Sequence, residues 1–185
     1  MSEISSRETL LRAASRLFRL KGYDGTGLNE ILQASGLPKG SLYHHFPGGK
    51  RELAEAATRT GGEAVARLVE RVFSEAEDFT SGAVKVCETL ADVIAHQDTV
   101  LACPVASILQ AGAHEPHLRA AGQEVLASWN ACLVGHLRRL GEPAPEMAAE
   151  MLIMQMEGAW MLSLAEQDGA PFLRLAQWLE RQKAA

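Results

Sequence analysis

The sequence contains little cysteine, few aromatic side chains and no long apolar run. Only three of its 185 residues are cysteines, and 5% are aromatic. Because Cys87, Cys103 and Cys132 are odd in number and form no C-x-x-C pair, they fit neither a disulfide framework nor a zinc finger. A chain of this length buries roughly 70% of its unfolded surface without such cross-links. The composition therefore indicates an ordinary globular protein in a reducing compartment.

Patterns for membrane insertion and export are lacking as well. The longest charge-free run, Thr99–Ala113, is shorter than the ~20 residues that cross a bilayer, and it contains Pro104. The segment Met1–Arg12 carries charges where a signal peptide needs an apolar centre. We therefore expect a cytoplasmic protein without a membrane partner.

The sequence also offers no evident set of catalytic or metal-binding residues. We find no Ser-His-Asp set, phosphate-binding loop or pair of catalytic carboxylates. The run His114-Glu115-Pro116-His117 looks like a metal motif, but its spacing is not H-E-x-x-H and its proline interrupts a helix. We expect no enzyme, no cofactor and no metal site.

The net charge of -5 would by itself argue against a nucleic-acid-binding protein. The charge is unevenly distributed, however. The first 52 residues hold eight Lys or Arg against five Asp or Glu, a net charge of +3. The other 133 residues hold ten bases and eighteen acids, a net charge of -8. This asymmetry predicts two domains, a small basic one over 1–52 that meets a polyanion and a larger acidic one over 53–185.

Helical periodicity covers almost the whole chain, and no segment alternates as a strand does. The first helix should end at Gly22, and Thr26 should cap the short helix that follows. A second short helix is predicted at about 39–46, and a long helix from about 50 into the 70s, weakened at Gly61-Gly62. Later helices are predicted at about 80–97, 105–112, 116–140, 144–168 and 171–183. The fold class is therefore all-α, with about nine helices.

Residues 26–46 have the pattern of a helix-turn-helix, two short helices joined by a tight turn at Gly36. Leu42 and Phe46 lie four residues apart and should face inward, beside Leu37. That leaves an outer face able to donate hydrogen bonds to phosphates or base edges, formed by Lys39, Gly40, Tyr43 and His44. An ordinary helical hairpin with a solvated polar face has the same pattern, so the residues alone leave both interpretations open.

A resemblance adds to this pattern. Gly22-Tyr23-Asp24-Gly25-Thr26, Ile31, the run Ser35–Phe46 and Lys50 closely resemble the DNA-binding segment of the TetR/AcrR family of bacterial transcription regulators. The similarity covers about residues 7–55. It implies a three-helix DNA-binding domain whose second short helix lies at the DNA. Gly27 departs from the family, which more often has Ser, Thr or Val there, and Pro47-Gly48-Gly49 occurs in one branch.

Carried over from the family, Lys39, Ser41, Tyr43 and His44 would lie on the recognition helix at the DNA. Thr26, Tyr43 and Lys50 would hold the DNA backbone. Gly40 has no side chain, so the protein backbone there could approach the groove closely. The candidate DNA-binding residues are Thr26, Lys39, Gly40, Ser41, Tyr43, His44 and Lys50.

A second resemblance concerns the acidic part. Cys103-Pro104-Val105-Ala106, Trp129 and Glu157-Gly158-Ala159 resemble the branch that includes lincomycin- and flavonoid-responsive repressors of efflux genes. In this family the C-terminal part binds a ligand and dimerises. The candidate effector-binding residues are Cys103, Trp129, Met154, Glu157, Trp160 and Met161.

Each effector candidate also has a plainer interpretation. Met147, Met151, Met154 and Met161 share one helical stripe, which suits a deformable pocket wall or, as we favour for any single methionine, a packed core or a dimer seam. Glu157 is either poised for a polar ligand group or a structural carboxylate with its own partner. Cys103 is an oxidation sensor or, as we favour, a plain buried thiol.

The sequence as a whole predicts a homodimeric repressor that an apolar or aromatic effector releases from a palindromic DNA operator. The last two predicted helices, 144–168 and 171–183, would form the dimer interface. Such a protein would act in the bacterial cytoplasm, associated with the nucleoid. Two alternatives are an architectural DNA-binding dimer without an effector, and a helical small-molecule carrier or enzyme.

Overall fold

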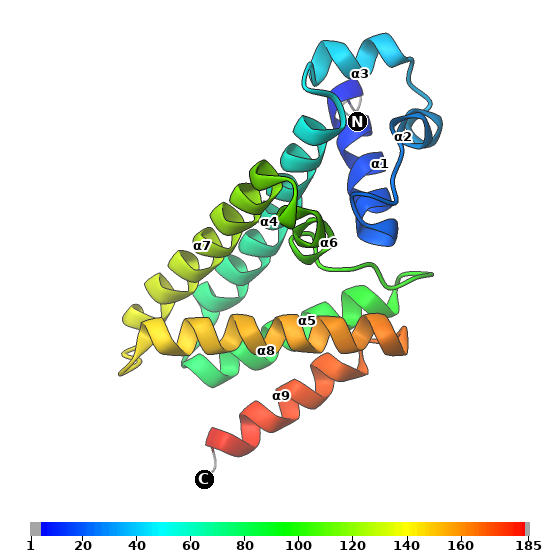
Figure 1. The fold of residues 1–185 in the computed structure, drawn as a ribbon. Helices are drawn as coiled ribbons and strands as arrows, with labels where there is room; N and C mark the ends of the chain where they lie inside the picture. The colour runs from blue at the N-terminus through cyan, green and yellow to red at the C-terminus, as the bar shows by residue number, and fades with distance from the viewer. Residues whose placement is uncertain (1–4, 184–185) are drawn as a thin grey trace. The chain divides into compact units, whose positions relative to one another are not determined.

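The computed structural model describes residues 5–183, and this part of the chain forms nine α-helices, one short 3-10 helix and no strand (Figure 1). The predicted all-α fold is thereby confirmed. The elements are α1 (Ser6–Lys21), α2 (Leu28–Ser35), α3 (Lys39–His45), α4 (Gly49–Glu75), α5 (Phe79–Ala95), α6 (Ala106–Leu109), η1 (Gln110–Ala113), α7 (Pro116–Arg139), α8 (Pro145–Glu166) and α9 (Ala170–Lys183). Only the helix predicted at 105–112 differs in kind, because it divides into α6 and η1.

The described residues separate into two compact units. Unit 1 holds residues 5–63 and 103–126, and unit 2 holds residues 64–102 and 127–183. The long helices α4 and α7 contribute residues to both. These units are defined by contacts within the chain. The predicted division into a DNA-binding domain over 1–52 and a second domain over 53–185 concerns function and stays a prediction.

Helix α1 shows how local sequence sets the ends of an element. At its start the Ser5 hydroxyl accepts a hydrogen bond from the Glu8 amide at 3.2 Å, which satisfies one of the free amides of the first turn. At its end Gly22 has φ +73°, where a side chain would be strained, and its amide donates to the Phe18 carbonyl. The predicted end at Gly22 is confirmed.

Unit 1 has one apolar core, to which α1 contributes most. Helix α1 packs against α2, α3 and α6. Leu42 and Phe46 are buried in this core and Leu37 packs against it, as the spacing predicts. The large, fully buried side chains of the cluster are Leu10, Phe18, Ile31, Leu42, Phe46, Leu53, Ile108 and Leu118.

Helix α4 runs without a break through Gly61 and Gly62, so the predicted weak point is not an interruption. A Cβ atom at Gly61 would lie 2.8 Å from Pro104, and one at Gly62 would lie 2.3 Å from Val125. Both separations are too short for real contacts. The two glycines therefore serve close packing of unit 1, where α7 and the chain before α6 approach α4.

Unit 2 is built around the packing of α9 against α5 and α8. The α8–α9 turn approaches α5 so closely that a Cβ at Gly169 would lie 2.7 Å from the Ala91 carbonyl oxygen. At the far end of α9, the Lys183 ammonium lies 2.7 Å from the Asp78 carboxylate. The core side chains include Phe73, Val86, Leu133, Leu137, Leu152 and Phe172. None of the helices in the described range combines the length and the apolarity needed to cross a bilayer.

Candidate nucleic-acid interface

The turn between α2 and α3 is set by one glycine and one proline. Gly36 ends α2 in the left-handed conformation, at φ +67° and ψ 14°, and its amide donates to the Gln33 carbonyl. Pro38 then precedes α3 in an extended conformation, with its carbonyl accepting from the Ser41 amide. Left-handed backbone costs a residue with a side chain roughly 1–2 kcal/mol, so glycine suits this turn. The sharp turn is what allows α3 to leave the direction of α2.

Helix α3 buries one side and exposes the other, as predicted. Lys39, Gly40 and His44 are exposed, Tyr43 is 42% exposed, and Ser41 is half-buried. The Lys39 ammonium lies 5.8 Å from the centre of the Tyr43 ring, within the range of a cation–π contact. A cation and a phenol hydroxyl thus stand together on an open face.

Gly40 leaves this face flat. Apart from its chain neighbours and the backbone of its own helix, a Cβ atom built there would meet no atom of the described residues within 4 Å. The absence of a side chain therefore serves no internal packing. It lowers the surface of α3 between Lys39 and His44, so that another molecule can approach the backbone.

The start of α4 adds a second cationic position. The Lys50 ammonium lies 4.1 Å from the centre of the Tyr23 ring, a contact that restrains its long side chain. The Tyr23 phenol is neutral near pH 7, as tyrosine ordinarily is, and burial, then the charges of Glu115 and Asp24, raise its pKa further. The neutral ring is a stable platform for Lys50 beside the first turn of α4.

The turn before α4 is held by a side chain. Gly49 adopts φ +67°, and the Gly48 amide donates to a Glu52 carboxylate oxygen at 2.7 Å. Glu52 thereby satisfies an amide ahead of the helix and offsets part of the positive end of its dipole. The Pro47-Gly48-Gly49 sequence is thus compatible with an ordered helix start.

Thr26 corrects one expectation. The residue that caps α2 is Gly27, and no side chain donates or accepts there, so the prediction that Thr26 caps this helix is wrong. Thr26 is instead 1% exposed, and its hydroxyl donates to the carbonyls of Gly22 at 2.8 Å and Leu17 at 3.2 Å. It ties the α1–α2 connection to the end of α1, because α1 leaves carbonyls unsatisfied there.

Among the predicted DNA-binding residues, the exposed ones thus lie on α3, and the half-buried Lys50 lies at the start of α4. A short helix with lysine, tyrosine and histidine on one open face, set by a tight turn within a small helical unit, is the geometry of a helix-turn-helix protein. Comparison with known proteins agrees with this class.

Two family models match the chain. Residues 10–57 match the model of bacterial regulatory proteins of the tetR family. Residues 80–178 match the model of the C-terminal domain of LmrA/YxaF-like transcriptional regulators. The second match confirms the branch that Cys103–Ala106, Trp129 and Glu157–Ala159 indicate.

Two relatives and two solved structures extend the comparison over nearly the full length. The uncharacterized HTH-type regulator YxaF of Bacillus subtilis is 36% identical, over 93% of this chain and 92% of its own. The HTH-type regulator LmrA of the same organism is 34% identical, over 95% of each chain. A regulatory protein TetR from Rhodobacter sphaeroides superposes with a TM-score of 0.84 at 25% identity, covering 95% and 97%. A CifR variant complexed with operator DNA has a TM-score of 0.83 at 18% identity, covering 98% of each.

The chain therefore belongs to the TetR family of bacterial transcription regulators, with a C-terminal domain of the LmrA/YxaF type. It is a DNA-binding transcriptional regulator of the helix-turn-helix class.

The predicted effector residues have diverse environments. Trp129 and Trp160 are buried in unit 2, and the Trp160 indole donates to the Leu101 carbonyl at 2.9 Å. Glu157 is half-buried on α8 and has an interaction partner. Cys103 is buried in unit 1. These positions make Trp160 at least partly a core residue, with its polar atom satisfied.

The methionines of α8 are mostly exposed. Met147, Met154 and Met161 are 61%, 58% and 68% exposed, and Met151 also faces solvent. On α9, Trp178 and Leu173 are exposed as well. A group of exposed apolar side chains of this size commonly marks a surface that binds another molecule. The arrangement therefore favours the dimer-seam interpretation of the methionines over a pocket wall.

Sequence reasoning did not single out Tyr23 as the support of Lys50, nor the group Glu70, Cys132 and His136 in unit 2. No local pattern joins Tyr23 to Lys50, because the contact depends on the folding of unit 1. For the second group, Cys132 and His136 are four residues apart in a predicted helix, a spacing that could have identified two of the three members.

Proposed function

We propose that the protein is a homodimeric repressor that is released from a palindromic operator by a small apolar or aromatic effector. The observation that carries the DNA part is the open face of α3, where Lys39, Tyr43 and His44 are exposed around Gly40. Lysine and histidine there can donate to base edges in the major groove. Tyr43 and Lys50 suit phosphate oxygens, which fix the register on the duplex.

Thr26 and Ser41 have supporting parts in this proposal. The buried hydroxyl of Thr26 holds the connection between α1 and α2, and through it the placement of the helix pair. Ser41 is half-buried, so it reaches DNA only at the edge of the α3 face.

The dimer part rests on α8 and α9. In a two-fold dimer the same patch faces itself, so an exposed stripe of methionines with Trp178 would be covered by its own copy. Two copies of α3 related by a two-fold axis read an inverted repeat, with half-sites about one helical turn or a multiple apart. Repression follows from occupying such an operator in the bacterial cytoplasm.

The effector part rests on the family to which the chain belongs, together with Trp129 and Glu157 in unit 2. An effector acts only if it binds one arrangement of the dimer better than the other. A coupling of roughly 1–3 kcal/mol would change operator occupancy about 5- to 150-fold. An architectural dimer without an effector would show the same DNA binding but no such release.

Selection of bound duplexes from a random-sequence pool tests the proposal. We expect enrichment of an inverted repeat, and release of the enriched duplex by at least one member of a panel of aromatic drugs and flavonoids. Enrichment of a single direct half-site would contradict the dimer. Enrichment without release by any compound would favour the architectural alternative.

A further inference from the structure

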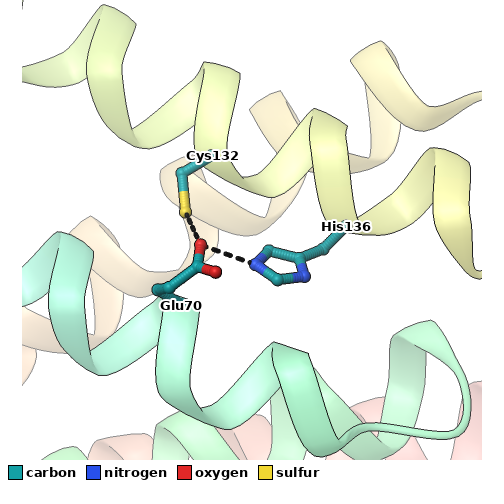
Figure 2. A group of neighbouring side chains, drawn as sticks. All are labelled: Glu70, Cys132 and His136. Atoms are coloured by element: carbon teal, nitrogen blue, oxygen red, sulfur yellow. Dashed lines mark hydrogen bonds and ion pairs between the residues drawn. The ribbon is translucent and has the colours of Figure 1, made fainter.

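Three side chains of unit 2 place different metal-binding atoms together. Glu70 extends from α4, and Cys132 and His136 extend from α7 toward it (Figure 2). One ligating atom from each of the three residues lies within 4.8 Å of the others. Cys132 and His136 are four residues apart, so they lie on the same face of α7, one turn from each other.

The separations of the Glu70 oxygen from its two neighbours are close to those around a tetrahedral ion. With metal–ligand bonds of 2.0–2.3 Å, tetrahedral ligands lie roughly 3.3–3.8 Å from one another. The Cys132 sulfur lies 3.5 Å from a Glu70 oxygen, within that range already. The His136 Nε2 lies 2.9 Å from the same oxygen, a hydrogen bond that would open by about half an ångström to admit an ion.

The donor set selects the kind of ion. Thiolate, imidazole and carboxylate together suit Zn²⁺, whereas Mg²⁺ and Ca²⁺ prefer oxygen ligands alone. A thiolate and a carboxylate also supply two negative charges, which balance those of the ion. Three protein ligands leave the fourth tetrahedral position for water.

Access and support also fit an ion site. The Glu70 side chain is 64% exposed and that of His136 is 11% exposed, so the group is open on the side of Glu70 and enclosed on the side of the imidazole. The His136 ring lies 6.0 Å from the Phe73 ring, and Arg139 donates to the Phe73 carbonyl at 2.6 Å. These contacts restrain the imidazole before an ion arrives.

From this geometry we propose that Glu70, Cys132 and His136 form a binding site for one Zn²⁺ ion. On binding, the ion takes the place of the thiol proton of Cys132, which goes to solvent, and a sulfur–zinc bond forms. His136 binds through Nε2 with its remaining proton on Nδ1. The ion then joins α4 to α7 within unit 2.

Without a metal ion, Glu70, Cys132 and His136 form a hydrogen-bonded group. Burial, then the hydrogen bond to Glu70 and its charge, raise the pKa of the Cys132 thiol to about 11. The hydrogen bonds from His136 and Cys132 in turn lower the pKa of Glu70. Without an ion, the three side chains are thus held together by the hydrogen bonds that Glu70 accepts from Cys132 and His136.

Titration of the untagged full-length protein with Co²⁺, a spectroscopic substitute for Zn²⁺, tests the site. We expect one equivalent of Co²⁺ per chain, with a thiolate-to-cobalt charge-transfer band and the intense visible bands of tetrahedral coordination. One equivalent of Zn²⁺ should abolish these bands. Six-coordinate spectra without the charge-transfer band would overturn the proposal.

Matched variants identify the ligands. Cys132→Ala should remove the charge-transfer band, whereas Cys87→Ala, a change of the same kind in a buried thiol of α5, should retain it. Glu70→Gln and His136→Gln should each weaken Co²⁺ binding by more than about tenfold, since loss of even an outer-shell partner costs 10- to 100-fold. His117→Gln is the control for the histidine.

Circular dichroism of the metal-free variants shows whether each one folds, and so distinguishes loss of a metal ligand from loss of the fold. If Cys132→Ala fails to fold, Glu70→Gln serves alone, because Glu70 is exposed and its replacement disturbs no core. Unchanged metal affinity in Glu70→Gln would then contradict the three-ligand site. None of these measurements contains DNA, so the result is independent of the repressor proposal.

Discussion

At the residue scale, the proposal gives general affinity for DNA to one side chain, Lys50, and discrimination among DNA sequences to two others, Lys39 and His44. Lys50 is held against Tyr23 at the start of α4, whereas Lys39 and His44 are exposed on α3. A phosphate contact releases counterions and so adds affinity for DNA of any sequence. A contact to a base edge adds affinity only for sequences that carry the matching base. The two kinds of residue should therefore give different signatures when replaced.

Lys50→Ala should weaken binding to the enriched operator and to unrelated DNA by similar factors. The slope of log affinity against log salt concentration should flatten by about 0.9 for each phosphate that the variant no longer neutralises. Fluorescence anisotropy over a salt series measures both. Lys85→Ala, an exposed lysine on α5 in unit 2, should leave the slope unchanged. An unaltered slope in Lys50→Ala would show that this residue does not bind phosphate.

Lys39→Ala and His44→Ala should change the preferred operator sequence, because removing a hydrogen bond to a base edge costs about 1–3 kcal/mol for the preferred base alone. The random-pool selection repeated with each variant gives the comparison. A consensus identical to that of the unmodified protein would show that these side chains do not read bases.

Gly40→Ala separates stability from binding. The added methyl meets no atom within 4 Å, and alanine is the better helix former by up to about 1 kcal/mol, so the variant should be at least as stable. Its methyl would nevertheless occupy the closest approach to the groove. The expected cost in operator affinity is similar to that of removing one base-edge hydrogen bond, ~1–3 kcal/mol.

Gly135→Ala on α7 is the control for this change, because its methyl would also meet no atom. We expect it to raise stability without affecting operator binding. Thermal unfolding and anisotropy on the two variants provide the data. Full affinity in Gly40→Ala would place α3 farther from the DNA than proposed.

At the element scale, the start of α5 depends on one carboxylate with two roles. Asp78 accepts from the Ser81 amide at 2.9 Å as the helix cap, and its other oxygen pairs with Lys183 at the end of α9. The hydrogen bond from Lys183, then that from Ser81, lower the pKa of Asp78. A lowered pKa means that this stabilisation is present above the pKa of the unfolded chain and is lost as pH falls through the folded value.

Asp78→Ala should lower the free energy of unfolding by about 0.5–2 kcal/mol near pH 7, the usual cost of losing a helix cap. Asp78→Asn keeps a capping oxygen but loses the charge, so it should cost less. Urea unfolding at neutral and acidic pH distinguishes these effects. The difference from the unmodified protein should shrink at acidic pH, and a difference that stays constant would contradict the titration.

The same scale shows which features sequence can predict. Periodicity and the Gly and Pro positions predict the order and approximate bounds of the helices, because these depend on neighbours a few residues away. The capping role predicted for Thr26 is wrong, since its hydroxyl bonds to Leu17, nine residues distant. The role of Gly61 and Gly62 and the support of Lys50 by Tyr23 likewise depend on contacts that only folding creates.

At the scale of the whole molecule, the proposed function depends on two chains acting together. The first 52 residues carry a net charge of only +3, which gives one chain limited attraction for DNA. Two chains joined through α8 and α9 would double the contacts on one duplex. The exposed methionines and Trp178, which a monomer would leave in water, are the surface available for that junction.

Met154→Glu and Trp178→Glu should each convert the dimer to a monomer, because two copies of the new charge would face an apolar seam. Sedimentation velocity over a concentration series measures the mass. Val93→Glu is the control, an apolar residue of comparable exposure on α5. A dimer that persists in both variants would place the interface elsewhere.

The proposed function requires two copies of α3 to read the two halves of one operator. Its most direct test is the stoichiometry and affinity of the full-length protein on the selected duplex and on a copy with one half-site scrambled. We predict two chains per intact duplex and a loss of at least about 100-fold on the scrambled one, since each mismatch costs about 1–3 kcal/mol. Equal affinity for both duplexes, with one chain bound to each, would show that the two half-sites are not read together by a dimer.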